Sequence, residues 1–175
     1  SDRIVFLDRT GGPWGVGELV SEKDLVAEDW YFSCHFKDVP VLAGSLIAEG
    51  CVQLLQFYLL YLGMQTQVED AFFQPIHGLA QVVRCRGQVI PGDPLMRYRM
   101  VVKEIGLEPA PYAVADFDIL VGERIVVDFR DLGVQLAREG SSIRIDRKLL
   151  EKHKGKAPND FDPITETVEP ASPED

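Results

Sequence analysis

The 175-residue sequence has few cysteines, and none of them form a CxxC pair. Cys34, Cys51 and Cys85 are an odd number at wide spacings. This pattern disfavours both a zinc site and a disulfide framework. We therefore expect reduced, buried thiols, no bound metal and a cytoplasmic protein.

Basic residues are also scarce, with 18 Lys and Arg against 28 Asp and Glu and a net charge of −10. Nucleic acids and anionic membrane surfaces both favour clustered basic residues, so we expect neither as a partner. The composition is not that of a disordered chain, because 46% of the residues are hydrophobic and 9% are aromatic. The length suits one ordinary domain with a tail.

The C-terminal end lacks both basic residues and large apolar groups. Residues 157–175 hold six acidic residues and four prolines, which leaves a net charge of −4 on the first 156 residues. Such a segment cannot offset the conformational entropy lost on ordering. The sequence predicts a domain over residues 1–145 and an acidic, proline-containing tail or linker over 146–175. Because the chain begins with Ser1 rather than Met, we expect a piece of a longer polypeptide.

The longest apolar stretch, Leu46–Met64, predicts a helix of about 28 Å. Apolar residues lie nearly all round this helix, which predicts burial. Glu49, Gln53 and Gln56 interrupt the stretch and argue against a membrane span. Residue patterns typical of strands cover Ile4–Leu7, Val16–Val20, Leu79–Val89, Leu95–Lys103, Tyr112–Val121 and Arg124–Gln135. The prediction is an α+β fold in which an antiparallel sheet of five to six strands curls around one long central helix.

A carboxylate stands one turn into the predicted helix. Glu49 is flanked by Leu46, Ile47 and Cys51. A carboxylic acid that burial keeps neutral can donate a proton. Alternatively, Glu49 reaches solvent at the rim of the fold or hydrogen-bonds with Gln53, four residues further along the helix.

Two more features lie just upstream of Glu49. His35 stands in the aromatic run 30–36, where a neutral imidazole can accept a proton near neutral pH, although a lone His there can equally be a satisfied core residue. Gly44 and Ser45 begin the helix, where unpaired N–H groups can stabilise an oxyanion and a glycine admits a close ligand oxygen. Many helices begin with Gly-Ser, so the pair alone does not decide between these alternatives.

Residues 35–53, HFKDVPVLAGSLIAEGCVQ, resemble the active-site block of the 3-hydroxydecanoyl-ACP dehydratase family, which has the hotdog fold. The residues that match the family pattern in register are His35, Pro40, Gly44, Glu49 and Gln53. The resemblance covers about residues 3–138 and includes Arg86–Val89 before a proline-containing turn. Ala43 stands where the family usually has Pro, and Glu49 where the decanoyl-type enzymes have Asp. The sequence looks like the FabA-like domains of polyunsaturated fatty acid or polyketide synthases.

This resemblance implies dehydration of 3-hydroxyacyl thioesters on acyl carrier protein to trans-2-enoyl thioesters. In that scheme His35 takes the C2 proton, Glu49 protonates the leaving hydroxyl, and the N–H of Gly44 holds the thioester carbonyl. Ser45 and Gln53 complete the substrate-binding residues. The resemblance implies no cofactor, because the substrate is carried on the phosphopantetheine of acyl carrier protein. It also implies a homodimer, or pairing with a second hotdog domain, in which one unit supplies the His and the other the acid.

Other activities and roles remain open. A hotdog thioesterase or hydratase would share the fold, and a non-catalytic hotdog would serve as a scaffold in a synthase. The basic side chains of Arg97, Arg99 and Lys103 are predicted to share one strand face. That face either meets the acidic carrier protein or is simply solvated.

Overall fold

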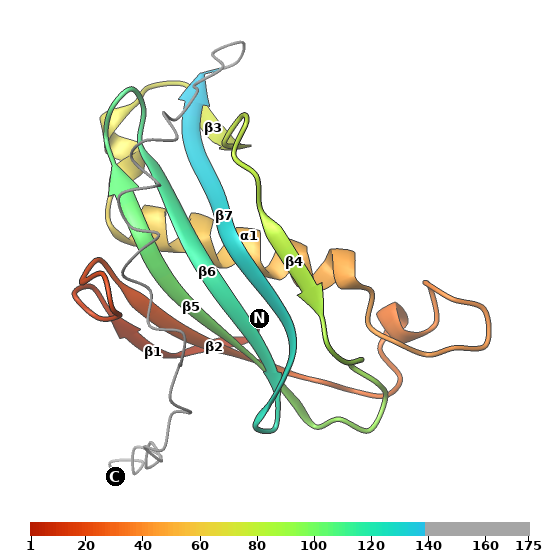
Figure 1. Cartoon of the computed structure of the whole chain (residues 1–175). Coiled ribbons are helices and arrows are strands. Elements are labelled where there is room, and N and C mark those ends of the chain that lie inside the picture. The colour runs from red at the N-terminus through yellow and green to blue at the C-terminus, as the bar shows by residue number, and fades with distance from the viewer. Residues whose placement is uncertain (139–175) are drawn as a thin grey trace, which may run out of the picture.

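The computed structural model describes residues 1–138, so the predicted boundary at residue 145 and the tail over 146–175 lie outside the described residues. One long helix, α1 (Gly44–Tyr61), lies between short 3-10 helices at Trp30–Phe32 and Met64–Gln67. The strands are β1 (Arg3–Asp8), β2 (Glu18–Asp24), β3 (Ala71–Pro75), β4 (Val82–Cys85), β5 (Leu95–Gly106), β6 (Tyr112–Val121) and β7 (Arg124–Arg138). Figure 1 shows them as one curled sheet with α1 across its face.

The sheet has seven strands in the order β1-β2-β5-β6-β7-β3, and β4 also pairs with β7. Every pairing is antiparallel. Both β3 and β4 lie on the outer side of β7, where β3 pairs with residues 134–138 and β4 with residues 127–130. A curled antiparallel sheet packed on one central helix confirms the predicted α+β hotdog fold, with one or two more strands than expected.

Some predicted element boundaries differ from the structure. The helix begins at Gly44 rather than at Leu46, and ends near Gly63, which has a left-handed backbone with φ of 77°. Strand β3 is absent from the prediction because it is only five residues long and ends in Pro75, a residue that cannot donate to a ladder. The predicted strand Leu79–Val89 shortens to β4, because the residues on either side of β4 leave the ladder.

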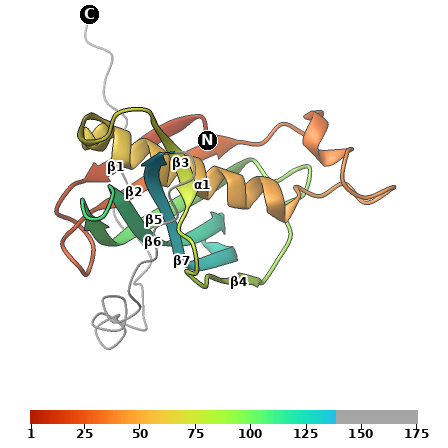
Figure 2. The ribbon, with the colours of Figure 1, turned by 90° about the horizontal axis from the view of Figure 1, so that it is seen from above.

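The core lies between α1 and the inner face of the sheet, which Figure 2 shows from above. The predicted alternation of β5 is confirmed, because Met96, Tyr98, Met100 and Val102 are all buried against the helix. At Gly50 the helix lies very close to the sheet, since a Cβ there would lie 2.6 Å from the Tyr98 hydroxyl. The sheet therefore positions the helix turn that carries Glu49.

The basic side chains on the opposite face of β5 are paired with carboxylates. Arg97 contacts Glu22 at 2.8 Å. Arg99 contacts Glu18 at 2.9 Å, and Lys103 contacts Asp131 at 2.7 Å. This pairing favours a solvated face of ion pairs over a surface for acyl carrier protein. Among the described residues, no helix has the length and apolar character to cross a membrane.

Candidate active site

The loop before α1 has a buried anchor and an exposed tip. Tyr31 and Phe32 are buried in the core, and the Tyr31 hydroxyl donates to Asp29. Residues 33–40 that follow are all exposed, and the loop projects past the sheet beside the start of α1 (Figures 1 and 2). His35 lies on this tip, with its ring 4.1 Å from that of Phe36. The expected burial of the whole aromatic run therefore holds only for its first part.

The tip turns back sharply before the helix. Asp38 has a positive φ of 62°, and the Val39 N–H donates to the Phe36 carbonyl at 3.4 Å. Asp tolerates this left-handed conformation better than most residues do. The chain then becomes buried again at residues 41–43, so His35 sits on a loop that is fixed at both ends.

The first turn of α1 is open to a ligand. The Ala43 carbonyl accepts the N–H groups of Leu46 and Ile47, at 3.0 and 3.2 Å. The preceding N–H groups, those of Gly44 and Ser45, belong to the helix positions that lack an intrahelical acceptor. A Cβ on Gly44 would have no heavy atom within 4 Å, and both residues are exposed. An incoming carbonyl oxygen can therefore approach this backbone freely.

Glu49 and Gln53 lie on an exposed stripe of the helix. The Gln53 Nε2 donates to Glu49 Oε1 at 3.0 Å, so the i,i+4 hydrogen bond that the sequence suggested is present. Both side chains are exposed in the single chain, and Glu49 is not the buried carboxylate that its apolar neighbours suggested. Positions 45, 49, 53, 57 and 61 follow one another at four-residue spacing on this face. The stripe thus runs from the helix start through the candidate acid to aromatic residues.

The aromatic end of the stripe is the part that the sequence did not single out. Phe57 is 39% exposed and Tyr61 is 52% exposed, and their rings stack at 6.2 Å. Tyr58, the next residue after Phe57, is fully buried in the core, as expected of a core residue. The helical period separates the two residues, because Tyr58 is in phase with Cys51 and Leu55 on the buried side.

The structure brings some predicted site residues together and leaves others apart. Glu49 and Gln53 are in contact, and they share the first half of α1 with Gly44 and Ser45. Within residues 1–138, no hydrogen bond, ion pair or ring contact joins His35 to Glu49. A single chain therefore presents the two candidate catalytic groups separately.

Two further predictions concern cysteine and metal. The expectation of buried thiols is wrong for Cys34 and Cys85, which are exposed, and correct for Cys51. Cys85 is exposed because β4 lies at the edge of the sheet, and Cys34 because it stands on the loop tip. Burial raises the pKa of the Cys51 thiol well above its ordinary value. Across the described part of the chain, no group of three His, Cys, Asp or Glu side chains could hold a metal ion.

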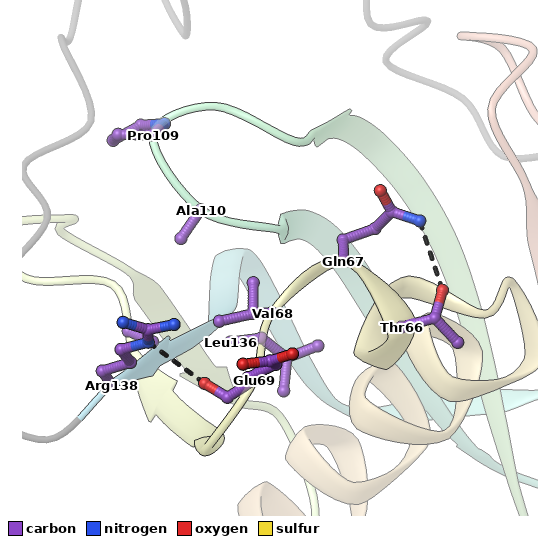
Figure 3. A pocket seen from close by; sticks show the side chains of 9 residues that line it. Thr66, Gln67, Val68, Glu69, Pro109, Ala110, Leu136 and Arg138 are labelled. Atoms are coloured by element: carbon purple, nitrogen blue, oxygen red, sulfur yellow. Dashed lines mark hydrogen bonds between the residues drawn. The ribbon is translucent and has the colours of Figure 1, made fainter.

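A pocket of about 540 Å³ lies beyond the end of the helix that is opposite to Gly44. Its lining residues come from the turn after α1, the β5–β6 connection and the end of β7 (Figure 3). Within it the Arg138 Nε donates to the Glu69 carbonyl at 3.1 Å, and Gln67 donates to Thr66 at 3.2 Å. None of the candidate site residues lines this pocket.

Comparison with known proteins assigns the chain to a family. The model described as FabA-like domain matches residues 1–130. The chain belongs to this FabA-like family. One of the subunits of a polyunsaturated fatty acid synthase from Thraustochytrium sp. is 34% identical over 173 residues, which are 85% of this chain. The FabA-like chain spans 12% of the length of that relative.

Solved structures with a similar fold are much more distant in sequence. A probable thioesterase from Bartonella henselae is 13% identical, with a TM-score of 0.49 over 73% of this chain and 98% of that one. A hypothetical protein from Thermus thermophilus is also 13% identical, with a TM-score of 0.48 over 80% of this chain and 98% of that one. The assignment of this FabA-like domain rests on the family match and on its own topology.

Proposed function

We propose that this FabA-like domain is a dehydratase that converts 3-hydroxyacyl thioesters on acyl carrier protein to trans-2-enoyl thioesters. The observation that carries the proposal is the order of groups at the start of α1. An open N–H at Gly44 lies one turn and a half before a carboxyl group, Glu49, that Gln53 orients. The family match and the synthase relative support the same reaction class.

Each residue has a defined task in the proposed elimination. The neutral imidazole of His35 removes the C2 proton while the Gly44 N–H stabilises the enolate oxygen of the thioester. The C3–O bond then breaks as Glu49 gives its proton to the hydroxyl, so the products are water and the C2=C3 double bond. The proton on His35 returns to Glu49 through solvent, which restores both groups. Ser45 adds a second N–H at the helix start.

We further propose that His35 and Glu49 act together only across two chains. Both side chains are exposed and separate in one chain. A two-fold dimer that brings the loop tip of one protomer to the α1 stripe of its partner would form two equivalent sites. A second hotdog domain of a longer polypeptide would serve the same purpose. The substrate needs no resident cofactor, because acyl carrier protein brings it on phosphopantetheine.

The test is enoyl formation from a 3-hydroxyacyl thioester, followed by absorbance, with free thiol measured in parallel. We expect His35→Ala and Glu49→Gln each to lose more than about 10²-fold in rate, the lower bound for acid–base catalysis. His77→Ala and Glu69→Gln are matched controls, because both residues are exposed outside the site, and they should keep full activity. Free thiol without enoyl product would identify a thioesterase instead, and no product of either kind would favour a scaffold.

The shared site has its own test. Equimolar His35→Ala and Glu49→Gln chains form heterodimers in about half of the population, and each heterodimer has one intact site, so the mixture should recover about 25% of wild-type activity. Subunit exchange is verified separately with differently tagged chains. Exchange without recovered activity would contradict the shared site while leaving the reaction class intact.

A further inference from the structure

Residues 86–89 are fastened to strand β7 although they no longer belong to β4. The N–H groups of Arg86 and Gly87 both donate to the Val126 carbonyl, at 2.8 and 3.0 Å. Gly87 permits this approach, because a Cβ there would lie 3.2 Å from a Val126 methyl group. The segment is thus held against the sheet by two backbone hydrogen bonds to one oxygen.

A buried carboxylate reinforces this attachment. The Arg86 Nε donates to Asp128 Oδ2 at 2.8 Å, and Asp128 is only 1% exposed. Arg84 and Arg130 lie 3.7 and 3.8 Å from the other oxygen of Asp128, beyond hydrogen-bonding distance. A carboxylate this deeply buried has little water to replace a lost partner. Arg86 therefore supplies the side-chain hydrogen bond that Asp128 makes among the described residues.

The same segment holds the approach to the candidate site. The Val89 carbonyl accepts the Leu42 N–H at 2.9 Å, and both residues are buried. Leu42 precedes Gly44 by two residues, and Ala43 between them supplies the carbonyl that begins the helix. The position of Val89 therefore bears directly on where the first turn of α1 starts.

We propose that the Arg86–Asp128 ion pair positions the oxyanion-binding turn: it fixes residues 86–89 to β7, and Val89 in turn holds Leu42 and hence the N–H of Gly44. This role rests on the proposed dehydratase function. Arg86 touches no reacting atom in this scheme, so it is a positioning residue. The connection joins the outer face of the sheet to the start of α1 through backbone hydrogen bonds.

The expected consequence falls on the rate constant rather than on substrate binding. A hydrogen-bond donor that serves the developing enolate contributes mainly in the transition state, so its displacement lowers kcat more than it raises KM. A misplacement of 1 Å can cost about 10²-fold, so the smaller shift expected here should cost roughly tenfold.

Three variants of the purified full chain test the role. Arg86→Met keeps the aliphatic stem and removes the charge, and Arg86→Lys restores a cation near Asp128. Glu22→Gln is the matched control, since Glu22 pairs with Arg97 on the same sheet far from residues 86–89. The two readouts are hydrogen exchange at the Leu42 amide and the separate values of kcat and KM.

In Arg86→Met we expect exchange at Leu42 to accelerate by about tenfold, consistent with the loss of a charged hydrogen bond. We expect kcat to fall about tenfold with KM within twofold, Arg86→Lys to recover most of both effects, and Glu22→Gln to change neither. Unchanged exchange at Leu42, or faster exchange with unchanged kcat, would overturn the proposal. A wild-type chain without dehydratase activity would refute the proposed function, and the exchange at Leu42 would then decide whether the clamp itself exists.

Discussion

Replacing Gly50 with alanine tests how closely α1 must approach the sheet beside Glu49. The added Cβ would lie 2.6 Å from the Tyr98 hydroxyl and 2.9 and 3.0 Å from two carbon atoms of its ring. Distances below 3.0 Å require atoms to move, and Tyr98 is only 2% exposed within the core cluster. The rigid ring has no open space into which to turn.

The magnitude follows from two opposing effects. Overpacking a core typically costs about 1–3 kcal/mol, whereas alanine in place of a helical glycine returns about 1 kcal/mol. Because a ring rather than a flexible chain end blocks the Cβ, we use the upper end of the first range. Gly50→Ala should therefore lower the free energy of unfolding by about 2 kcal/mol.

Denaturant unfolding at one fixed chain concentration measures this loss, since self-association would make the apparent stability depend on concentration. Gly44→Ala is the matched control in the same helix, with no atom within 4 Å of its Cβ, and should be as stable as wild type or slightly more stable. In the Tyr98→Leu background, Gly50→Ala should cost at least about 1 kcal/mol less. A stable Gly50→Ala chain, or strictly additive effects in the double variant, would refute the steric argument.

Further perturbations have equally definite outcomes. The hydrogen bonds from Arg97 lower the pKa of the Glu22 carboxyl, so its stabilisation exists above the unfolded-state pKa and disappears as the pH falls through the lower folded value. Urea unfolding should thus find Glu22→Gln less stable than wild type at pH 7, with the gap closing in acid. Gly17→Ala would drive a Cβ into the buried Tyr58 ring at a φ of 141°, and its soluble yield should collapse. Phe57→Ser should leave monomer unfolding within about 0.5 kcal/mol of wild type but weaken self-association in sedimentation.

Local sequence patterns predict the parts of this fold that local forces determine. The alternation in residues 96–103 identifies the buried face of β5 because successive strand side chains point to opposite sides. The block from His35 to Gln53 places the candidate site because its spacing matches a known motif. The Glu49–Gln53 hydrogen bond follows from the four-residue period of the helix.

The features that sequence analysis missed depend on partners distant in the chain. Strand β3 exists because β7 is long enough to pair with it beyond the end of β4, and no local signal records that length. The bond between Leu42 and Val89 joins residues 47 positions apart in two irregular segments. Apolar neighbours suggested that Glu49 is buried, but they could not reveal which side of the helix the sheet covers.

The exposed stripe of α1 links the missed burial of Glu49 to the proposed two-chain site. The helix is apolar nearly all round, yet its own sheet covers only the side of Cys51 and Leu55, and leaves Phe57 and Tyr61 exposed. A contiguous apolar surface of this kind is typical of an interface. Any protomer that covers the aromatic part of the stripe would also exclude water from Glu49, which lies on the same face. On this proposal the environment that keeps a carboxylic acid neutral, and so able to protonate a leaving hydroxyl, arises on association rather than on folding.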